Sequence, residues 1–285
     1  MAPGLWHLAQ WGARLFPGHF FLNLAHCPFH RFMDRAFLLL ALAGLWPLLT
    51  IFGVKSWSDL GLVSPAGQGR RLLGGLTTGF VTLGLVALLA VAVGGRPLAD
   101  FRGGARVAGV FFSAMGTAVV VAVLEEVLFR GGLFNGLRRV MWWPVALGIT
   151  CLIYALVHFL QHGEVTGPVH WYSGLTLLPA MLGGFAELTA LVPGFFTLAL
   201  AGLLLGLAYQ RTGNLYFSMG LHGGWIFWLK CYRSFTADIP GEPSWIWGTG
   251  KLIDGWAAFF VLLLSLTVVC RFRFPAQKPA MPMPA

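Results

Sequence analysis

Two adjacent glutamates and an arginine end an apolar segment that is otherwise suited to a lipid bilayer. The segment begins near Val107 as VAGVFFSAMGTAVVVAVL and leads directly into Glu125, Glu126 and Arg130. A carboxylate inside a membrane-spanning helix is costly, so such groups face a hydrated cavity or pair with an opposite charge. On a helix, Glu126 and Arg130 share a face at the spacing of an ion pair. Glu125 points about 100° away from Glu126, so we predict that it is available for chemistry.

The same residues also have a purely structural interpretation. Glu126 and Arg130 can form a pair that only stabilises the helix, while Glu125 reaches the lipid headgroups. A third acidic residue in an apolar stretch, Glu187 in GGFAELTAL, is expected to cap a helix or to form a local hydrogen bond. The glutamate pair alone leaves both interpretations open.

Two histidines in other apolar segments favour chemistry. His158 lies in LIYALVHF and His222 lies in SMGLHGGWIF, each with few other strongly polar neighbours. A lone histidine is more often a satisfied core residue than a catalyst, but two of them beside a glutamate pair are harder to explain structurally. We therefore predict that Glu125, His158 and His222 meet around one hydrated cavity. His162, four residues after His158, could complete a metal pair, although its position at a loop edge favours a surface residue.

The composition predicts that an integral membrane protein carries these residues. The chain of 285 residues is 57% hydrophobic and 10% charged, whereas soluble domains have about 25% charged residues. The net charge of +9 comes from basic residues scattered between apolar segments, where they meet anionic headgroups, so we expect no nucleic-acid partner. The cysteines are too far apart to suggest a disulfide or a cysteine-based metal site: Cys27, Cys151, Cys231 and Cys270.

We predict an all-α, polytopic membrane protein with about eight transmembrane helices in one bundle at residues 36–271. A span needs roughly 17–25 apolar residues, and the candidates are residues 36–54, 72–93, 107–129, 143–160, 173–192, 195–209, 215–229 and 256–270. Residues 1–35 mix Trp and Phe with His and Arg, which is typical of a helix in the membrane interface. The loop at 232–255 is expected to form an interfacial lid, and the Pro-rich residues 272–285 a disordered tail.

In order along the chain, these residues resemble the motifs of the CPBP family. This family comprises the CAAX proteases and the bacteriocin-processing, Abi-like enzymes, which are intramembrane glutamic endopeptidases. Its EExxxR motif is matched from Glu125 to Arg130, with two glycines behind it. Its FxxxH motif is matched from Tyr154 to His158, with tyrosine in place of phenylalanine.

The later part of the family pattern is matched less completely. The stretch GLLLGLAYQRTGNL at residues 202–215 is similar to the family's GxxxGxxYxxTGN approach to its last motif. That motif, HxxxN, begins at His222, but Ile226 occupies the asparagine position. The resemblance covers a core of about residues 110–230.

The resemblance implies a peptidase inside an eight-helix bundle. Glu125, assisted by His158, would act as general base and activate a water molecule for attack on a peptide carbonyl. Glu126 and Arg130 would fix the helix and tune the charge of the site. His222 would donate a hydrogen bond to the oxyanion, an interaction worth about 3–4 kcal/mol.

The family's asparagine shares this oxyanion role, and the side chain of Ile226 has no donor. The second oxyanion donor is then Trp225 or a backbone amide, or the site has no second donor. Tyr154 keeps the aromatic ring of the family pattern. Ile226 therefore favours an alternative in which a weakened immunity or scaffold protein retains the fold. A proton-coupled transporter would also use buried ionisable groups, but the chain shows no inverted repeat.

The expected substrate is a membrane protein or lipidated peptide of the CAAX type or the leader type, cleaved in the bilayer. We expect the cytoplasmic (inner) membrane of a prokaryote as the location. No cofactor is expected. A zinc-dependent version with Glu125, His158 and His222 as ligands is the alternative, since three such ligands and a water suit catalytic zinc.

Overall fold

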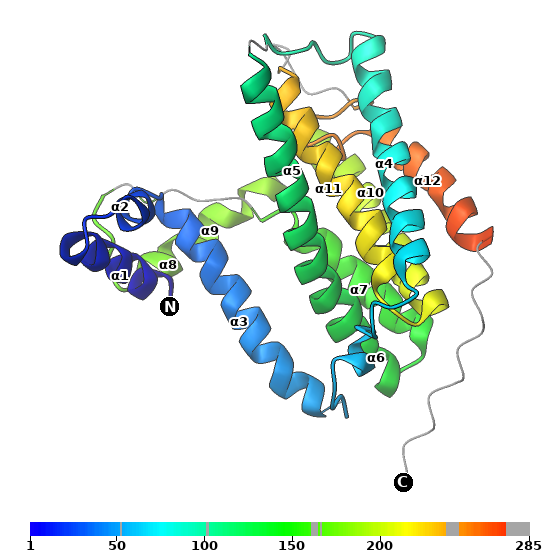
Figure 1. Cartoon of the computed structure of the whole chain (residues 1–285), viewed down its shortest axis with the longest axis horizontal. Coiled ribbons are helices and arrows are strands. Elements are labelled where there is room, and N and C mark those ends of the chain that lie inside the picture. Colours follow the sequence, from blue (N-terminus) through cyan, green and yellow to red (C-terminus); the bar gives the residue numbers. More distant parts are fainter. Residues whose placement is uncertain (52, 101–102, 161–164, 166, 238–244, 272–285) are drawn as a thin grey trace. The chain divides into compact units, whose positions relative to one another are not determined.

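The structure is a computed structural model, and its regular elements are helices throughout the part of the chain that it describes (Figure 1). That part consists of residues 1–51, 53–100, 103–160, 165, 167–237 and 245–271. It contains one isolated β-bridge, between Leu98 and Thr236, and no strand. The predicted all-α fold class is therefore confirmed. The tail at 272–285, His162 and part of the expected lid at 232–255 lie outside the described residues.

The chain divides into two compact units, and the first comprises Met1–Leu48 and Val157–Glu187. Its helices are α1 (Ala2–Leu15), α2 (His19–Ala25), most of α3 (Phe29–Ile51), α8 (Ser173–Thr176), α9 (Leu178–Met181) and the short η3 (Leu182–Phe185). They enclose a small apolar core, which consists of Ala2, Ala9, Phe29, Phe32, Met33, Ala36, Leu177 and Met181.

The second unit comprises Leu49–Leu156 and Leu188–Ala285. Its elements are η1 (Ser58–Leu60), α4 (Gly69–Ala92), α5 (Gly104–Glu125), η2 (Glu126–Phe134), α6 (Asn135–Val140), α7 (Trp143–Val157, up to Leu156), α10 (Leu188–Thr212), α11 (Tyr216–Phe235) and α12 (Trp256–Arg271). Helix α11 is largely buried and contacts α4, α5 and α10. It is therefore the central helix of this unit.

In the described part of the chain, four helical segments are long and apolar enough to cross a membrane: Phe29–Ile51, Gly69–Ala92, Gly104–Val140 and Leu188–Thr212. The third extends the predicted span 107–129 by more than two turns. The predicted span 173–192 is wrong as a single helix, because α8, α9 and η3 interrupt it. Pro179, which lacks a backbone N–H, lies in the first turn of α9. The total of eight spans and the interfacial position of residues 1–35 stay predictions.

Helices α4 and α11 run in the same direction with their backbones in contact (Figure 1). Gly75 and Gly79 of α4 lie against α11, while Gly220 and Gly224 of α11 lie against α4. A methyl group at Gly79 would overlap the carbonyl oxygen of Leu221. Pairs of small residues four apart allow this close approach between membrane helices.

Replacing Gly79 with alanine is therefore expected to destabilise the protein by about 1–3 kcal/mol, the usual cost of overpacking. The backbone of α11 cannot rotate away as a side chain would. Thermal unfolding in detergent measures the effect. Gly116→Ala is the matched control, because a methyl group there meets no atom within 4 Å and alanine is the better helix former. Equal melting temperatures for the two variants would contradict the role of the glycine contact.

The turn between α10 and α11 holds the η1 segment in place. The hydroxyl of Tyr209 donates to the carbonyl oxygen of Leu60 at 3.3 Å, and the backbone N–H of Leu215 donates to Gly61 at 3.1 Å. Gly213 has φ of +69°, a left-handed conformation that favours glycine. The YxxTGN part of the family pattern is thus an architectural element that fixes where α11 begins.

Candidate active site

The helix that carries the two glutamates changes its winding where they occur. Helix α5 ends at Glu125, and the chain continues as the π-helix η2 (Glu126–Phe134) before α6. A π-helix has i→i+5 hydrogen bonds in place of i→i+4, and such turns are frequent at functional sites. Most of η2 is buried. The regular helix predicted at 107–129 did not anticipate this change, which alters where the side chains after Glu125 point.

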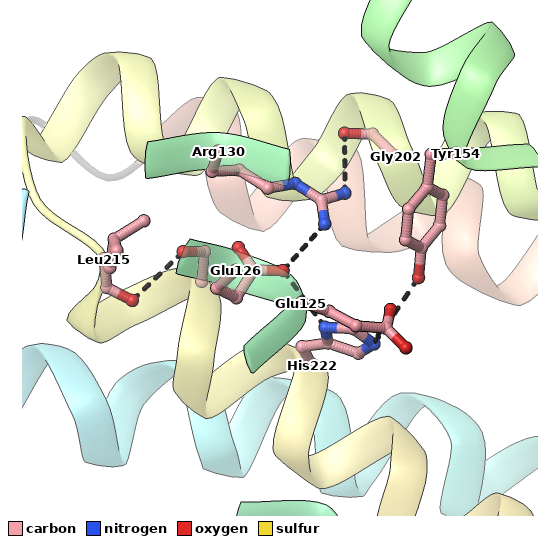
Figure 2. Close-up of polar contacts among 8 residues, drawn as sticks. Glu125, Glu126, Arg130, Tyr154, Gly202, Leu215 and His222 are labelled. Atoms are coloured by element: carbon pink, nitrogen blue, oxygen red, sulfur yellow. Dashed lines mark hydrogen bonds and ion pairs between the residues drawn. The ribbon is translucent and has the colours of Figure 1, made fainter. Parts of the chain in front are cut away.

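Glu126 is the fully buried member of the glutamate pair, and the side chains of Arg130 and His222 contact it (Figure 2). Arg130 Nη1 donates to Glu126 Oε1 at 2.8 Å, the ion pair expected from their spacing. His222 Nδ1 lies 3.0 Å from the same oxygen. Arg130 Nη2 also donates to the carbonyl oxygen of Gly202 in α10 at 3.4 Å. The Glu126 carboxylate therefore joins the α5–η2 helix to α11, and its arginine partner reaches α10.

Glu125 is the accessible member of the pair. Its side chain is 27% exposed, whereas that of Glu126 is 0% exposed. Glu125 Oε2 lies 3.8 Å from His222 Nε2, which is within ion-pair range and beyond a hydrogen bond. The imidazole of His222 thus lies between two carboxylates, with Nδ1 toward Glu126 and Nε2 toward Glu125. Glu126 is therefore the buried, ion-paired glutamate and Glu125 the partly exposed one, while the catalytic role of Glu125 stays a prediction.

Tyr154 of α7 completes the cluster (Figure 2). Its hydroxyl lies 3.4 Å from His222 Nε2. The guanidinium carbon of Arg130 is 4.6 Å from the centroid of the tyrosine ring, a cation–π distance. Phe129 packs edge-on against the same ring at 5.1 Å between centroids. The sequence predicted the ring of Tyr154 at this position but not the contact of its hydroxyl.

Trp225 and Ile226, next to and at the family's asparagine position, contact α4 and α5, respectively. The indole N–H of Trp225 donates to the hydroxyl of Thr82 in α4 at 3.0 Å, so that donor is occupied. Ile226 is buried and packs against Ala118 and Ala122 of α5. It fills an apolar contact between α5 and α11, one helical turn beyond the histidine.

Two other predicted residues, His158 and Glu187, belong to the first unit. His158 directly follows α7 and belongs to the first unit, so its help to Glu125 stays a prediction, as does the hydrated cavity. Glu187 is exposed and directly precedes α10, where a carboxylate favours the helix N-terminus. Among the described residues, no group of three His, Cys, Asp or Glu side chains is arranged to hold a metal ion.

Comparison with known families adds independent information. Residues 107–228 match the family model described as type II CAAX prenyl endopeptidase Rce1-like. This match confirms the family resemblance that the motifs indicated, over nearly the segment predicted from them. No curated protein and no solved structure was found to match the chain. The matched segment runs from α5 to α11 and includes every residue of the cluster.

Proposed function

Because residues 107–228 of this chain match the Rce1-like CAAX prenyl endopeptidases, we propose that it is an intramembrane glutamic endopeptidase acting on prenylated C-terminal peptides. The match to this family and the four apolar helices of the described residues support a membrane protease in coarse terms. The observation that carries the finer proposal is the arrangement of the accessible Glu125 carboxylate beside His222, with the buried Glu126–Arg130 pair behind them. The proposed location is the cytoplasmic membrane of a prokaryote.

In the proposed reaction, Glu125 acts as general base. Its carboxylate accepts a proton from a water molecule while the water oxygen attacks the carbonyl carbon of the scissile peptide bond. The electron pair of the C=O bond moves onto the oxygen, which becomes the oxyanion of a tetrahedral intermediate. When the intermediate collapses, the C=O bond re-forms and the C–N bond breaks. The amine leaves with the proton held by Glu125, so one water molecule is consumed.

His222 can donate to that oxyanion only through Nε2. Its Nδ1 faces the Glu126 carboxylate at 3.0 Å, and an ionised carboxylate only accepts, so Nδ1 carries a proton. A ring that also donates from Nε2 is an imidazolium. Two glutamates then face Arg130 and the imidazolium with equal and opposite formal charge. Such balance matters because an uncompensated buried charge is strongly destabilising.

The test is cleavage of a farnesylated, internally quenched peptide that ends in a CAAX sequence. The protein purified in detergent is expected to release the C-terminal tripeptide, identified by mass spectrometry, and to do so equally in EDTA or 1,10-phenanthroline. The same peptide without the farnesyl group is the matched control and is expected to react more slowly. Loss of cleavage with both chelators would favour the zinc-dependent alternative.

A second candidate function is an immunity or scaffold protein that retains the fold without catalysis. Ile226 at the family's asparagine position favours it. Such a protein would bind its membrane partner equally well when Glu125 is replaced by alanine, because binding needs no general base. Absence of peptide cleavage together with partner binding that survives Glu125→Ala would support this alternative over the protease.

A further inference from the structure

The chain departs from the family pattern at two positions, and both lie next to His222. Tyr154 adds a hydroxyl where the pattern has phenylalanine, and Ile226 removes the amide of the asparagine. Considered together, the pair of changes loses one hydrogen-bond donor and gains another. The question is whether the Tyr154 hydroxyl lies where it can replace the asparagine amide as a donor.

The Tyr154 hydroxyl lies next to the nitrogen that the oxyanion requires. It is 3.4 Å from His222 Nε2, and Nε2 is the ring nitrogen that does not contact Glu126. Oxyanion donors lie about 2.7–3.1 Å from the developing charge. Two donors 3.4 Å apart leave room for one oxygen atom at that distance from both. The hydroxyl and Nε2 can therefore bind the same oxyanion.

The hydroxyl is also held rigidly, as a preorganised donor must be. Tyr154 is 3% exposed, and its ring contacts the Arg130 guanidinium at 4.6 Å and the Phe129 ring at 5.1 Å. On the α10 side, a methyl group added at Gly202 would be in van der Waals contact with a Tyr154 ring carbon, at 3.4 Å. These contacts fix the ring and, with it, the direction of the O–H bond to within a rotation about C–O.

Ile226 leaves the neighbouring position without any donor. Its side chain is buried against Ala118 and Ala122, and the indole N–H of Trp225 is committed to Thr82. Among the described side chains around His222, the Tyr154 hydroxyl is the donor that contacts Nε2.

We propose that Tyr154 is the second oxyanion donor of this protein and that its hydroxyl replaces the asparagine amide absent at position 226. The proposal rests on the proposed function. In the resting site the Nε2–H of the His222 imidazolium donates to the hydroxyl oxygen. When the tetrahedral intermediate forms, the hydroxyl and this N–H both donate to its oxyanion, so the phenol and the imidazolium keep their protons.

The experiment compares four proteins with the farnesylated CAAX peptide: wild type, Tyr154→Phe, Ile226→Asn, and the double variant. Tyr154→Phe keeps the ring and its contact with Arg130 and removes only the donor. It is expected to lower kcat by about a hundredfold, the effect of losing one oxyanion donor, with KM changed less than twofold. Ile226→Asn in the wild type is expected to change kcat little. In the double variant the new amide is expected to restore at least a tenth of the wild-type kcat.

Each outcome decides the proposal. Wild-type kcat in Tyr154→Phe would overturn it, and so would a double variant no faster than Tyr154→Phe, because the hydroxyl would then act in some other way than the amide. A rise in KM with constant kcat would also overturn it, since it would indicate a role in substrate binding. If the asparagine variants do not fold, as judged by thermal unfolding, Ile226→Thr supplies a donor with less change of shape.

The experiment also separates this proposal from the one on which it rests. A wild-type protein that does not cleave the peptide would overturn both. An active wild type that Glu125→Gln inactivates, together with an active Tyr154→Phe, would preserve the protease and reject only the role of the hydroxyl.

Discussion

Replacing Glu125 with glutamine is expected to lower kcat for cleavage of the farnesylated peptide by about a thousandfold, within the range of a general base. Glutamine has the same size and still hydrogen-bonds, but it cannot accept the proton of the attacking water. KM should change little, because the substitution leaves the shape of the site intact. Stability should fall less than in Glu126→Gln, because the Glu125 side chain is 27% exposed and that of Glu126 is 0% exposed. Steady-state kinetics and thermal unfolding of the purified variant measure both effects.

Two further variants make this result specific. Glu187→Gln is the matched control, because this exposed glutamate belongs to the first unit and directly precedes α10. Its kcat is expected to stay at the wild-type value, and its stability to fall by at most about 1 kcal/mol through the lost charge at the helix N-terminus. Glu126→Gln is expected to lose activity and stability together, because the buried Glu126 carboxylate holds Arg130 and His222. If Glu125→Gln cleaved at the wild-type rate while Glu126→Gln stayed folded and inactive, the base would be Glu126.

The local geometry of the site could be predicted from the sequence because short spacings on a helix fix which side chains meet. Glu126 and Arg130 are four residues apart, and the ion pair between them follows directly. The different environments of Glu125 and Glu126 follow from the angle between neighbours on a helix. Even the π-helical winding after Glu125 keeps this pair together, although nothing in the local sequence pattern indicated that winding.

For helices far apart in the sequence, it could be predicted which residues share the site but not which atoms make contact. The sequence indicated that Glu125 and His222 share a site, but not that His222 directs Nδ1 to Glu126. That orientation depends on the rotation and height of α11 against α5, which the glycine contacts of α11 with α4 help to determine. The contact of the Tyr154 hydroxyl with His222 has the same origin, since it joins residues 68 positions apart.

The hydropathy pattern predicted the long helices better than the short ones. Helix α11 extends past the predicted span 215–229 to Phe235, carries Ser218, His222 and Lys230, and is largely buried. Protein rather than lipid therefore surrounds most of it. The stretch 173–192 is apolar enough to span, yet it breaks into short helices near Pro179. Hydropathy records the average polarity of a segment, whereas backbone continuity depends on single residues such as proline.

Replacing Arg130 with methionine is expected to destabilise the folded protein by about 3–5 kcal/mol, the cost of removing one partner of a buried ion pair. The Arg130 side chain is 1% exposed and its partner Glu126 is 0% exposed. Methionine has a similar length and apolar stem, so the loss arises from the charge and the hydrogen bonds rather than from a large cavity. Unfolding of the variant in detergent, followed by thermal or denaturant titration, measures the change.

Two comparisons test that the buried charge is the cause. Arg138→Met is the matched control, because Arg138 donates to the neutral side chains of Gln210 and Asn135, and its loss leaves no carboxylate unpaired. It is expected to cost much less than Arg130→Met. Adding Glu126→Gln to Arg130→Met removes the unpaired negative charge and is expected to recover part of the lost stability. The two residues would act independently if the effects of Arg130→Met and Glu126→Gln on the free energy of unfolding simply added in the double variant. The Glu126–Arg130 pair would then not be what anchors the π-helix beside Glu125.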